Sequence, residues 1–208
     1  NFLAYLGWSP GDDSEIHSLE ELCKPFTLDR VSKGGAVFNH KKLLWYNEHY
    51  LREIPDQQLA KKVREISQNE AVQSADEAYL ARAISLLKER VSKVDELEKM
   101  GSFFFEDPEE YDSKALNKWK EDSTALVSEY QKEIESMDDD GFEAGTLKQK
   151  LEGVIERNEV GFGKLMMPLR IAVTGQGFGP DLFISMEMLG KETVMRRIDR
   201  ALSSLAQE

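Results

Sequence analysis

The sequence predicts an all-α fold, a compact cage of short helices preceded by a mainly helical connector. Apolar residues recur at spacings of three and four along most of the chain, which is the period of an amphipathic helix. No run of β-branched residues alternates with polar ones over any length, so strands are not indicated. Glycine, proline and acidic clusters interrupt the pattern at short intervals, which favours short helices with short connections.

The first 38 residues contain several short elements rather than one long helix. The residues that interrupt them are Gly7, Pro10, Gly11, Pro25, Gly34 and Gly35. Such punctuation predicts a connector attached to a larger body. From Asn39 the pattern becomes helical, because Asn39 can cap a helix that Pro55 then closes.

Three further helices are predicted in the rest of the first half. The first carries the apolar stripe Leu59, Val63 and Ile66. Ser74 with Glu77 forms a capping-box pattern at the start of the next helix. Ser92 with Asp95 is a looser version of the same pattern, before a helix that leads into three phenylalanines at 103–105. Three consecutive rings cannot all face one way on a helix, so most of this cluster is expected to pack inside.

The second half repeats this style. One predicted helix carries the stripe Leu126, Tyr130, Ile134 and Met137 and ends at the acidic turn 138–141. Thr146 can cap the next helix, whose apolar residues are Leu147, Leu151, Val154 and Ile155. Gly190 then separates two shorter helices, 181–189 and 191–205.

Composition is that of an ordinary globular protein of 208 residues with 40% hydrophobic content. A single cysteine, Cys23, rules out an intramolecular disulfide and a multi-cysteine metal site, and we expect it to be a small packed side chain. The sequence contains neither 18 successive apolar residues nor a signal peptide, so we expect a cytoplasmic protein without a membrane partner. Because the chain begins without methionine, we expect a fragment of something longer.

The net charge of −12 argues against a polyanionic partner, since phosphate contacts need lysine and arginine. The acidity is concentrated in residues 101–160, which hold 17 acidic and 7 basic residues. Such a block is typical of a solvated face, and the flanks can still present a basic stripe. The alternative is a helical protein-interaction module that uses the acidic region as its docking face.

Residues with catalytic potential are few. His17, His40 and His49 are scattered, and no phosphate-binding loop, nucleophile elbow or paired histidine motif is present. The glycine-rich stretch 175–179 follows no predicted strand, so we expect a tight interhelical turn there. We therefore predict neither a catalytic site nor a metal site.

Basic residues on the predicted helices are more informative. Lys88, Arg90 and Lys93 fall at a junction between helices, where an exposed guanidinium can reach a base edge or a phosphate. A solvated helix end is the alternative for these three residues.

A second basic segment surrounds a proline. Lys164 and Arg170 flank Met166-Met167-Pro168, and Pro168 should kink a helix or mark its start. An arginine beside a proline, followed by an exposed loop after Gly175, could form a surface that reads unstacked bases.

Several segments together resemble the carboxy-terminal half of a bacterial glutamyl-tRNA synthetase. The most specific ones lie in residues 163–201: Pro168-Leu169-Arg170, Thr174-Gly175, Pro180 with Leu182, and Leu189-Gly190-Lys191. Residues 1–10, 28–33, 41–47 and 86–91 extend the resemblance over nearly the whole chain.

The resemblance implies an organisation and an activity. Residues 1–54 would be the end of the family's stem-contact region, 55–111 its first helical anticodon-binding subdomain, and 112–208 its second. The full-length enzyme would attach glutamate to tRNA(Glu) using ATP and magnesium. The family's catalytic motifs and its zinc-binding insertion are absent here, so we expect this polypeptide alone to activate no glutamate and to hold no cofactor.

The resemblance also implies which residues bind tRNA. Arg90, Arg170, Pro180 and Leu182 look like residues that contact anticodon bases. Met167 stands where a glutamine is common and Gly179 where a serine or threonine is common, so the exact base contacts, and any discrimination against glutamine tRNA, stay open. The remaining candidates for tRNA contact are Lys164, Lys93, Lys41 and Lys42. We expect a monomer that binds the anticodon and stem of tRNA(Glu) and does not bind DNA, although the isolated piece could have negligible affinity.

Overall fold

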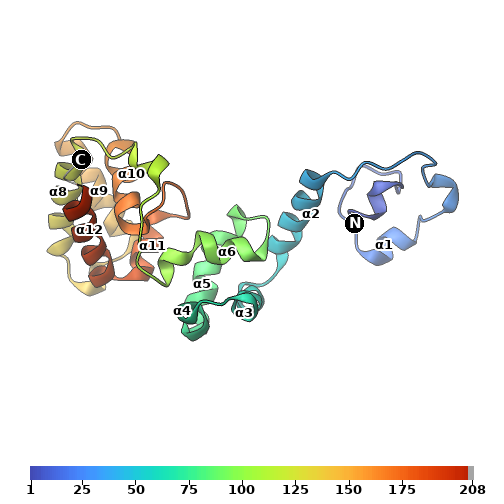
Figure 1. The fold of residues 1–208 in the computed structure, drawn as a ribbon, viewed down its shortest axis with the longest axis horizontal. Helices are drawn as coiled ribbons and strands as arrows, with labels where there is room; N and C mark the ends of the chain where they lie inside the picture. The colour runs from blue at the N-terminus through green and yellow to red at the C-terminus, as the bar shows by residue number, and fades with distance from the viewer. Residues whose placement is uncertain (206–208) are drawn as a thin grey trace.

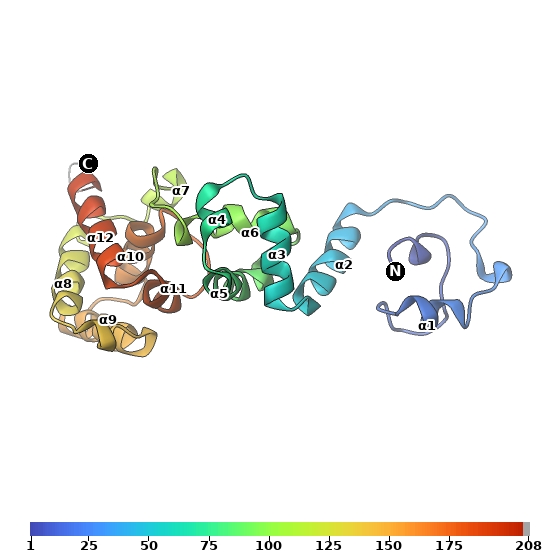
Figure 2. The ribbon, with the colours of Figure 1, turned by 90° about the horizontal axis from the view of Figure 1, so that it is seen from below.

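The computed structural model describes residues 1–205, and it is all-α as predicted: no strand occurs in that range. Figures 1 and 2 show an elongated molecule, with an N-terminal connector and two helical bodies following one another along the long axis. The apolar side chains form two separate cores, one in each body, as expected of a chain with two helical subdomains.

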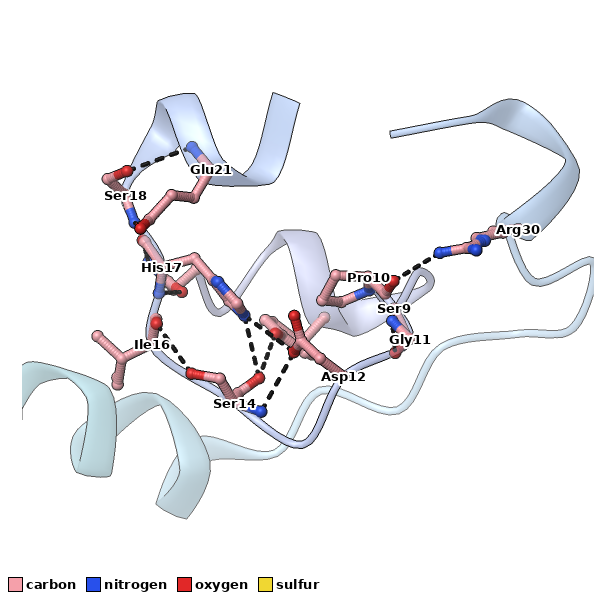
Figure 3. A network of polar contacts seen from close by, with 12 residues as sticks. Ser9, Pro10, Gly11, Asp12, Ser14, Ile16, His17, Ser18, Glu21 and Arg30 are labelled. Carbon is pink, nitrogen blue, oxygen red and sulfur yellow. Dashed lines mark hydrogen bonds and ion pairs between the residues drawn. The ribbon is translucent and has the colours of Figure 1, made fainter. Parts of the chain in front are cut away.

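The connector contains only short elements, as the glycine and proline pattern predicts. They are the 3-10 helix η1 (Ala4–Leu6), the helix α1 (Leu19–Cys23) and the 3-10 helix η2 (Leu28–Arg30). Arg30 fastens the loop between them by donating a hydrogen bond to the carbonyl of Pro10 (Figure 3). Cys23 is exposed, so its predicted role as a packed side chain is wrong.

The first body follows the connector. Its elements are α2 (His40–Glu53), α3 (Asp56–Ile66), α4 (Glu70–Ser74), α5 (Glu77–Leu87), η3 (Lys88–Arg90), α6 (Val94–Met100) and η4 (Ser102–Phe104). Leu59 and Val63 enter its core, whereas Ile66 is half exposed. Phe103 and Phe104 are buried there, as predicted for most of the phenylalanine cluster.

Helix starts in the first body are only partly as predicted. Asn39 caps α2, since its side-chain oxygen accepts from the backbone N–H of Lys42 at 3.1 Å. The capping box at Ser74 is wrong, because Ser74 ends α4 and Asp76 caps α5. The acidic partner before α6 is Glu96 rather than Asp95, and it accepts from the N–H groups at 92 and 93.

The second body contains the remaining helices. They are α7 (Ser113–Leu116), α8 (Ser123–Glu135), η5 (Asp139–Gly141), α9 (Ala144–Arg157), α10 (Gly163–Thr174), α11 (Leu182–Leu189) and α12 (Lys191–Leu205). Tyr130, Leu151 and Leu169 are fully buried among them. Pro168 lies inside α10 rather than at its start. The acidic turn at 138–140 is exposed, as expected of a solvated face.

Helix α9 begins two residues before Thr146, so the predicted cap at Thr146 is wrong. Its first N–H, on Ala144, is instead satisfied from outside the helix by a carboxylate oxygen of Glu187 at 2.9 Å. The other oxygen of Glu187 accepts from Arg82 on α5, and so links the second body to the first.

The Glu187 contacts should make stability depend on pH. Hydrogen bonds from Ala144 and then from Arg82 favour the ionised form and hold the pKa of Glu187 below its ordinary value of 4.5. A carboxyl with a lowered folded pKa contributes stability above its unfolded pKa, which is lost as the pH falls through the folded value. We expect the difference in unfolding free energy between the natural chain and Glu187→Gln to shrink between about pH 7 and about pH 3. Urea denaturation at both values measures it, and an unchanged difference contradicts the prediction.

The joint between the bodies has an apolar and a charged part. Met188 and Leu189 of α11 pack against the core of the first body, and α11 lies beside α5 and α6 in Figure 1. Arg197 is almost fully buried and donates to Asp107 Oδ1 at 2.8 Å, to the Val173 carbonyl at 3.0 Å and to the Glu106 carbonyl at 3.0 Å. Its guanidinium therefore ties the segment between the bodies to α10 and α12.

Within residues 1–205, no helix is both long and apolar enough to span a membrane. The same residues bring together no group of three or more histidine, cysteine or acidic side chains with the arrangement of a metal site.

Candidate nucleic-acid interface

The turn from 175 to 181, between α10 and α11, is held in place from both sides. Gly175 ends α10 in the left-handed conformation (φ 73°), which favours glycine. Its carbonyl accepts from the N–H of Asp112 at 2.8 Å, and the Thr174 hydroxyl accepts from the N–H of Gln176 at 3.2 Å. At the far end, Asp181 caps α11 by accepting from Ile184 at 3.0 Å. The sequence prediction of a tight interhelical turn is confirmed.

Arg170 lies under this turn instead of on an exposed surface. It is 9% exposed, and its Nη2 donates to the carbonyl of Pro180 at 2.9 Å. Its Nη1 is buried with no hydrogen-bond partner. A side chain at Gly179 would place Cβ 3.2 Å from that Nη1 and near nothing else. The turn therefore covers a donor that has no acceptor, and an incoming acceptor reaches this donor only if the turn moves.

Arg90 approaches the same place from the first body. Burial lowers the pKa of Arg170, Asp181 partly offsets this, and the charge of Arg90 lowers the pKa further. Arg90 is exposed at the end of η3. Neither guanidinium forms an ion pair with a carboxylate in residues 1–205. The charge of Arg90 thus acts on Arg170 from the other body, and an anion or an electron-rich base edge bound near both would offset this repulsion.

Pro180 and Leu182 do not present their side chains to solvent. Pro180 is buried, and Leu182 is completely buried in the core of the second body. The prediction of an exposed proline loop is wrong for these two residues, because the turn folds back over Arg170. Their visible roles are to supply the carbonyl that orients Arg170 and to anchor the start of α11.

The other candidates are distributed differently. Met167 is half-buried on α10, one turn before Arg170, and Lys93 is exposed beside the end of η3. Lys164 is exposed but donates to Asp122 at 2.9 Å, and this hydrogen bond lowers the pKa of Asp122. In the sequence, Met167 lies three residues from Arg170 and Lys93 three residues from Arg90, whereas Lys164 lies six residues from Arg170.

Lys41 and Lys42 are not part of the arginine cluster. Both lie in the first turn of α2, on the far side of α6 from α10 (Figure 1). Lys42 pairs with Glu15 and lies 4.2 Å from the centroid of the Trp45 ring. Any contact that these lysines make with RNA would fall on a separate part of the molecule.

The histidines form no catalytic arrangement. His17 Nε2 lies 3.1 Å from the backbone carbonyl of Ser14 and 3.3 Å from Asp12 Oδ1. The Ser14 hydroxyl donates to the carbonyl of Ile16 at 3.1 Å and does not face the imidazole (Figure 3). A serine nucleophile needs a base within hydrogen-bond reach, so this network organises the connector and does not activate Ser14.

One exposed side chain of the turn escaped the sequence analysis. Phe178 is 62% exposed, in the middle of the glycine-rich stretch. The feature in the sequence that could have pointed to it is an aromatic residue between two glycines. This pattern alone does not distinguish a solvent-facing ring from a packed one.

The helical architecture and the arginines at the joint are features of an RNA-binding helical module, and the family comparison agrees. The model of the family described as anticodon binding domain matches residues 58–202. The chain therefore belongs to the anticodon-binding-domain family.

Individual relatives agree with this. The glutamate–tRNA ligase of Christiangramia forsetii is 40% identical over 206 residues, which are 99% of this chain and 40% of that protein. The glutamate–tRNA ligase of Cytophaga hutchinsonii is 37% identical, over 100% of this chain and 40% of that protein. The chain thus spans about two fifths of the length of these relatives.

A solved structure shares the fold. The crystal structure of a glutamate–tRNA ligase from Elizabethkingia meningosepticum, in complex with its amino acid, superposes with a TM-score of 0.86 at 36% identity. The match covers 98% of this chain and 40% of that chain. The resemblance to bacterial glutamyl-tRNA synthetases is confirmed.

Proposed function

We propose that this chain recognises the anticodon of tRNA(Glu), through the surface around Arg90 and Arg170. The observation that carries the proposal is the position of Arg170 under the turn 175–181, where Nη2 bonds to the Pro180 carbonyl and Nη1 has no acceptor, with the charge of Arg90 acting on it from the other body. An unpartnered buried donor costs about 1 to 3 kcal/mol, which a bound acceptor would recover. A nucleic-acid base or phosphate supplies such an acceptor.

In the relatives, the region similar to this chain is part of a longer protein. The proposal extends to a longer protein of that kind. We propose that it is a ligase that attaches glutamate to tRNA using ATP and magnesium, and that this chain contributes recognition and no cofactor site. We propose anticodon-binding subdomains at 55–111 and 112–208, with 1–54 as a stem-contact segment. The two apolar cores support the boundary near 111, whereas Leu51 of α2 packs in the first core, so the first helical body begins before residue 55. We also propose that the protein is a monomer and does not bind DNA. Light scattering tests the first point, and competition with duplex DNA tests the second.

A helical protein-interaction module with an acidic docking face is the alternative. The exposed acidic turn at 138–140 suits such a role, but it lies at a distance from Arg90 and Arg170 in the chain. The family match favours RNA.

Salt dependence of tRNA binding separates the two functions. If lysine and arginine neutralise phosphates, the released counterions make affinity fall steeply with salt. We expect the dissociation constant of an anticodon stem-loop RNA to rise roughly tenfold or more between about 50 and 200 mM salt. Fluorescence anisotropy with a labelled stem-loop measures this. An RNA of the same length without the loop serves as the control, and absence of binding at the lowest salt would refute the proposed function.

A further inference from the structure

Phe178 is an aromatic side chain that packs in neither apolar core. Twelve large apolar side chains in residues 1–205 are exposed, eight of them before residue 46, and Phe178 is 62% exposed. Its ring pairs with none of the aromatic rings in that part of the chain. Exposing such a ring forgoes the apolar burial that Phe103 and Phe104 obtain in the core.

The backbone on both sides of Phe178 is fixed. A Cβ on Gly177 would lie 2.7 Å from the Cβ of Ala115 on α7, so this glycine sits directly against that helix. On the other side, the Pro180 carbonyl accepts a hydrogen bond from Arg170 Nη2, and a Cβ added at Gly179 would lie 3.2 Å from Arg170 Nη1. Phe178 is therefore displayed at a defined place, and its Cα is within about 7.6 Å of the Pro180 Cα because consecutive Cα atoms are about 3.8 Å apart.

We propose that Phe178 is a stacking platform for an unpaired base of the RNA loop, beside the base or phosphate that Arg170 contacts. This inference rests on the proposed function and adds a contact to the same site. Aromatic rings bind single-stranded nucleic acid by stacking on base faces, and arginines nearby supply the electrostatic attraction. The turn that carries the Phe178 ring also bonds the Arg170 guanidinium through Pro180, so one turn can offer both kinds of contact to successive nucleotides.

A second exposed phenylalanine on the same body provides a matched comparison. Phe162 is 45% exposed and precedes α10, whereas Phe178 follows it. A helix of 12 residues is about 18 Å long, so the two rings lie at opposite ends of α10. Only Phe178 adjoins the contacts to Arg170, and only Phe178 should contact the bound loop.

Binding of anticodon stem-loop RNA to Phe178→Ala, Phe178→Trp and Phe178→Leu tests the proposal. We expect Phe178→Ala to weaken binding roughly five- to hundredfold, which is the usual range for removing an aromatic stacking partner. Tryptophan should retain affinity, whereas leucine should not, because it supplies apolar area without a π face. Phe162→Ala should bind as the natural chain does. All four substitutions are at exposed positions, and thermal unfolding checks that the fold is intact.

The base involved can be located with abasic nucleotides. Each loop base is removed in turn, and each altered RNA is measured with the natural chain and with Phe178→Ala. At the stacked position the two losses should not add, because either change removes the same contact. Equal binding by Phe178→Ala and the natural chain, or additive losses at every position, would overturn the stacking role while leaving the proposed function intact. Failure of the natural chain to bind the unmodified stem-loop would instead overturn the proposed function and this inference with it.

Discussion

Replacing Arg170 by alanine is expected to weaken binding of tRNA with the glutamate anticodon by about 1 to 3 kcal/mol, or roughly five- to 150-fold. The physical reason is that Arg170 has one terminal nitrogen held by Pro180 and a second with no partner, so its free donor is aimed by the protein itself. The same substitution should weaken the binding of a tRNA with a mutated anticodon much less, because that tRNA lacks the acceptor that this donor contacts. Filter binding with both tRNAs measures the difference.

Two further variants define the role of Arg170. Arg170→Lys keeps the charge but lacks the planar fork that can bond Pro180 and a base at once, so it should restore little of the discrimination. Arg157→Ala removes an exposed arginine that pairs with Glu129 and Glu133 on α8, and it should leave tRNA binding unchanged. Equal loss on cognate and mutated tRNA would reduce Arg170 to a phosphate contact or a structural residue.

Replacing Gly175 by alanine is expected to destabilise the fold by about 3 kcal/mol, combining a left-handed non-glycine residue with overpacking. A Cβ at this position would lie 2.7 Å from Pro108 Cβ and 3.0 Å from the carbonyl of Glu110. The segment between the bodies would therefore have to move away from the end of α10. Chemical denaturation measures the loss of unfolding free energy.

A second glycine in the same body provides the control. Gly153 lies inside α9, and its nearest contact for an added Cβ is Arg157 Nη1 at 3.6 Å, an ordinary van der Waals distance. Gly153→Ala should therefore stabilise the chain by about 0.5 to 1 kcal/mol, because alanine loses less backbone entropy in a helix. Similar effects of the two substitutions would show that the close approach at Gly175 is tolerated.

Local signals in the sequence predicted most helices but not all of their starts. Asn39 and Pro55 bracket α2 because capping and proline chemistry act within a few residues. The start of α9 could not be predicted in this way. Its first N–H bonds to Glu187, 43 residues further along the chain, so a tertiary contact and not Thr146 sets the boundary.

The candidate site was predictable in its residues but not in its geometry. Basic residues at a helix junction and beside a proline drew attention to Arg90 and Arg170, and the resemblance implied their role. The burial of Arg170 was not foreseeable, because it depends on a carbonyl ten residues away in a turn that folds back over the helix. The exposure of Phe178 likewise depends on the path of this turn, and the effect of Arg90 on Arg170 arises only when the two bodies meet.

Arg90 and Arg170 belong to different helical bodies, so their separation depends on how the two bodies are joined. Neither body carries both arginines, so a change in the angle between the bodies would alter the distance between the two guanidinium groups. Misplacement of about 1 Å by a remote change can cost about a hundredfold in a geometry-dependent step. Asp107 and Arg197 form a 2.8 Å ion pair at the joint. They contact neither arginine, yet they constrain the distance between Arg90 and Arg170.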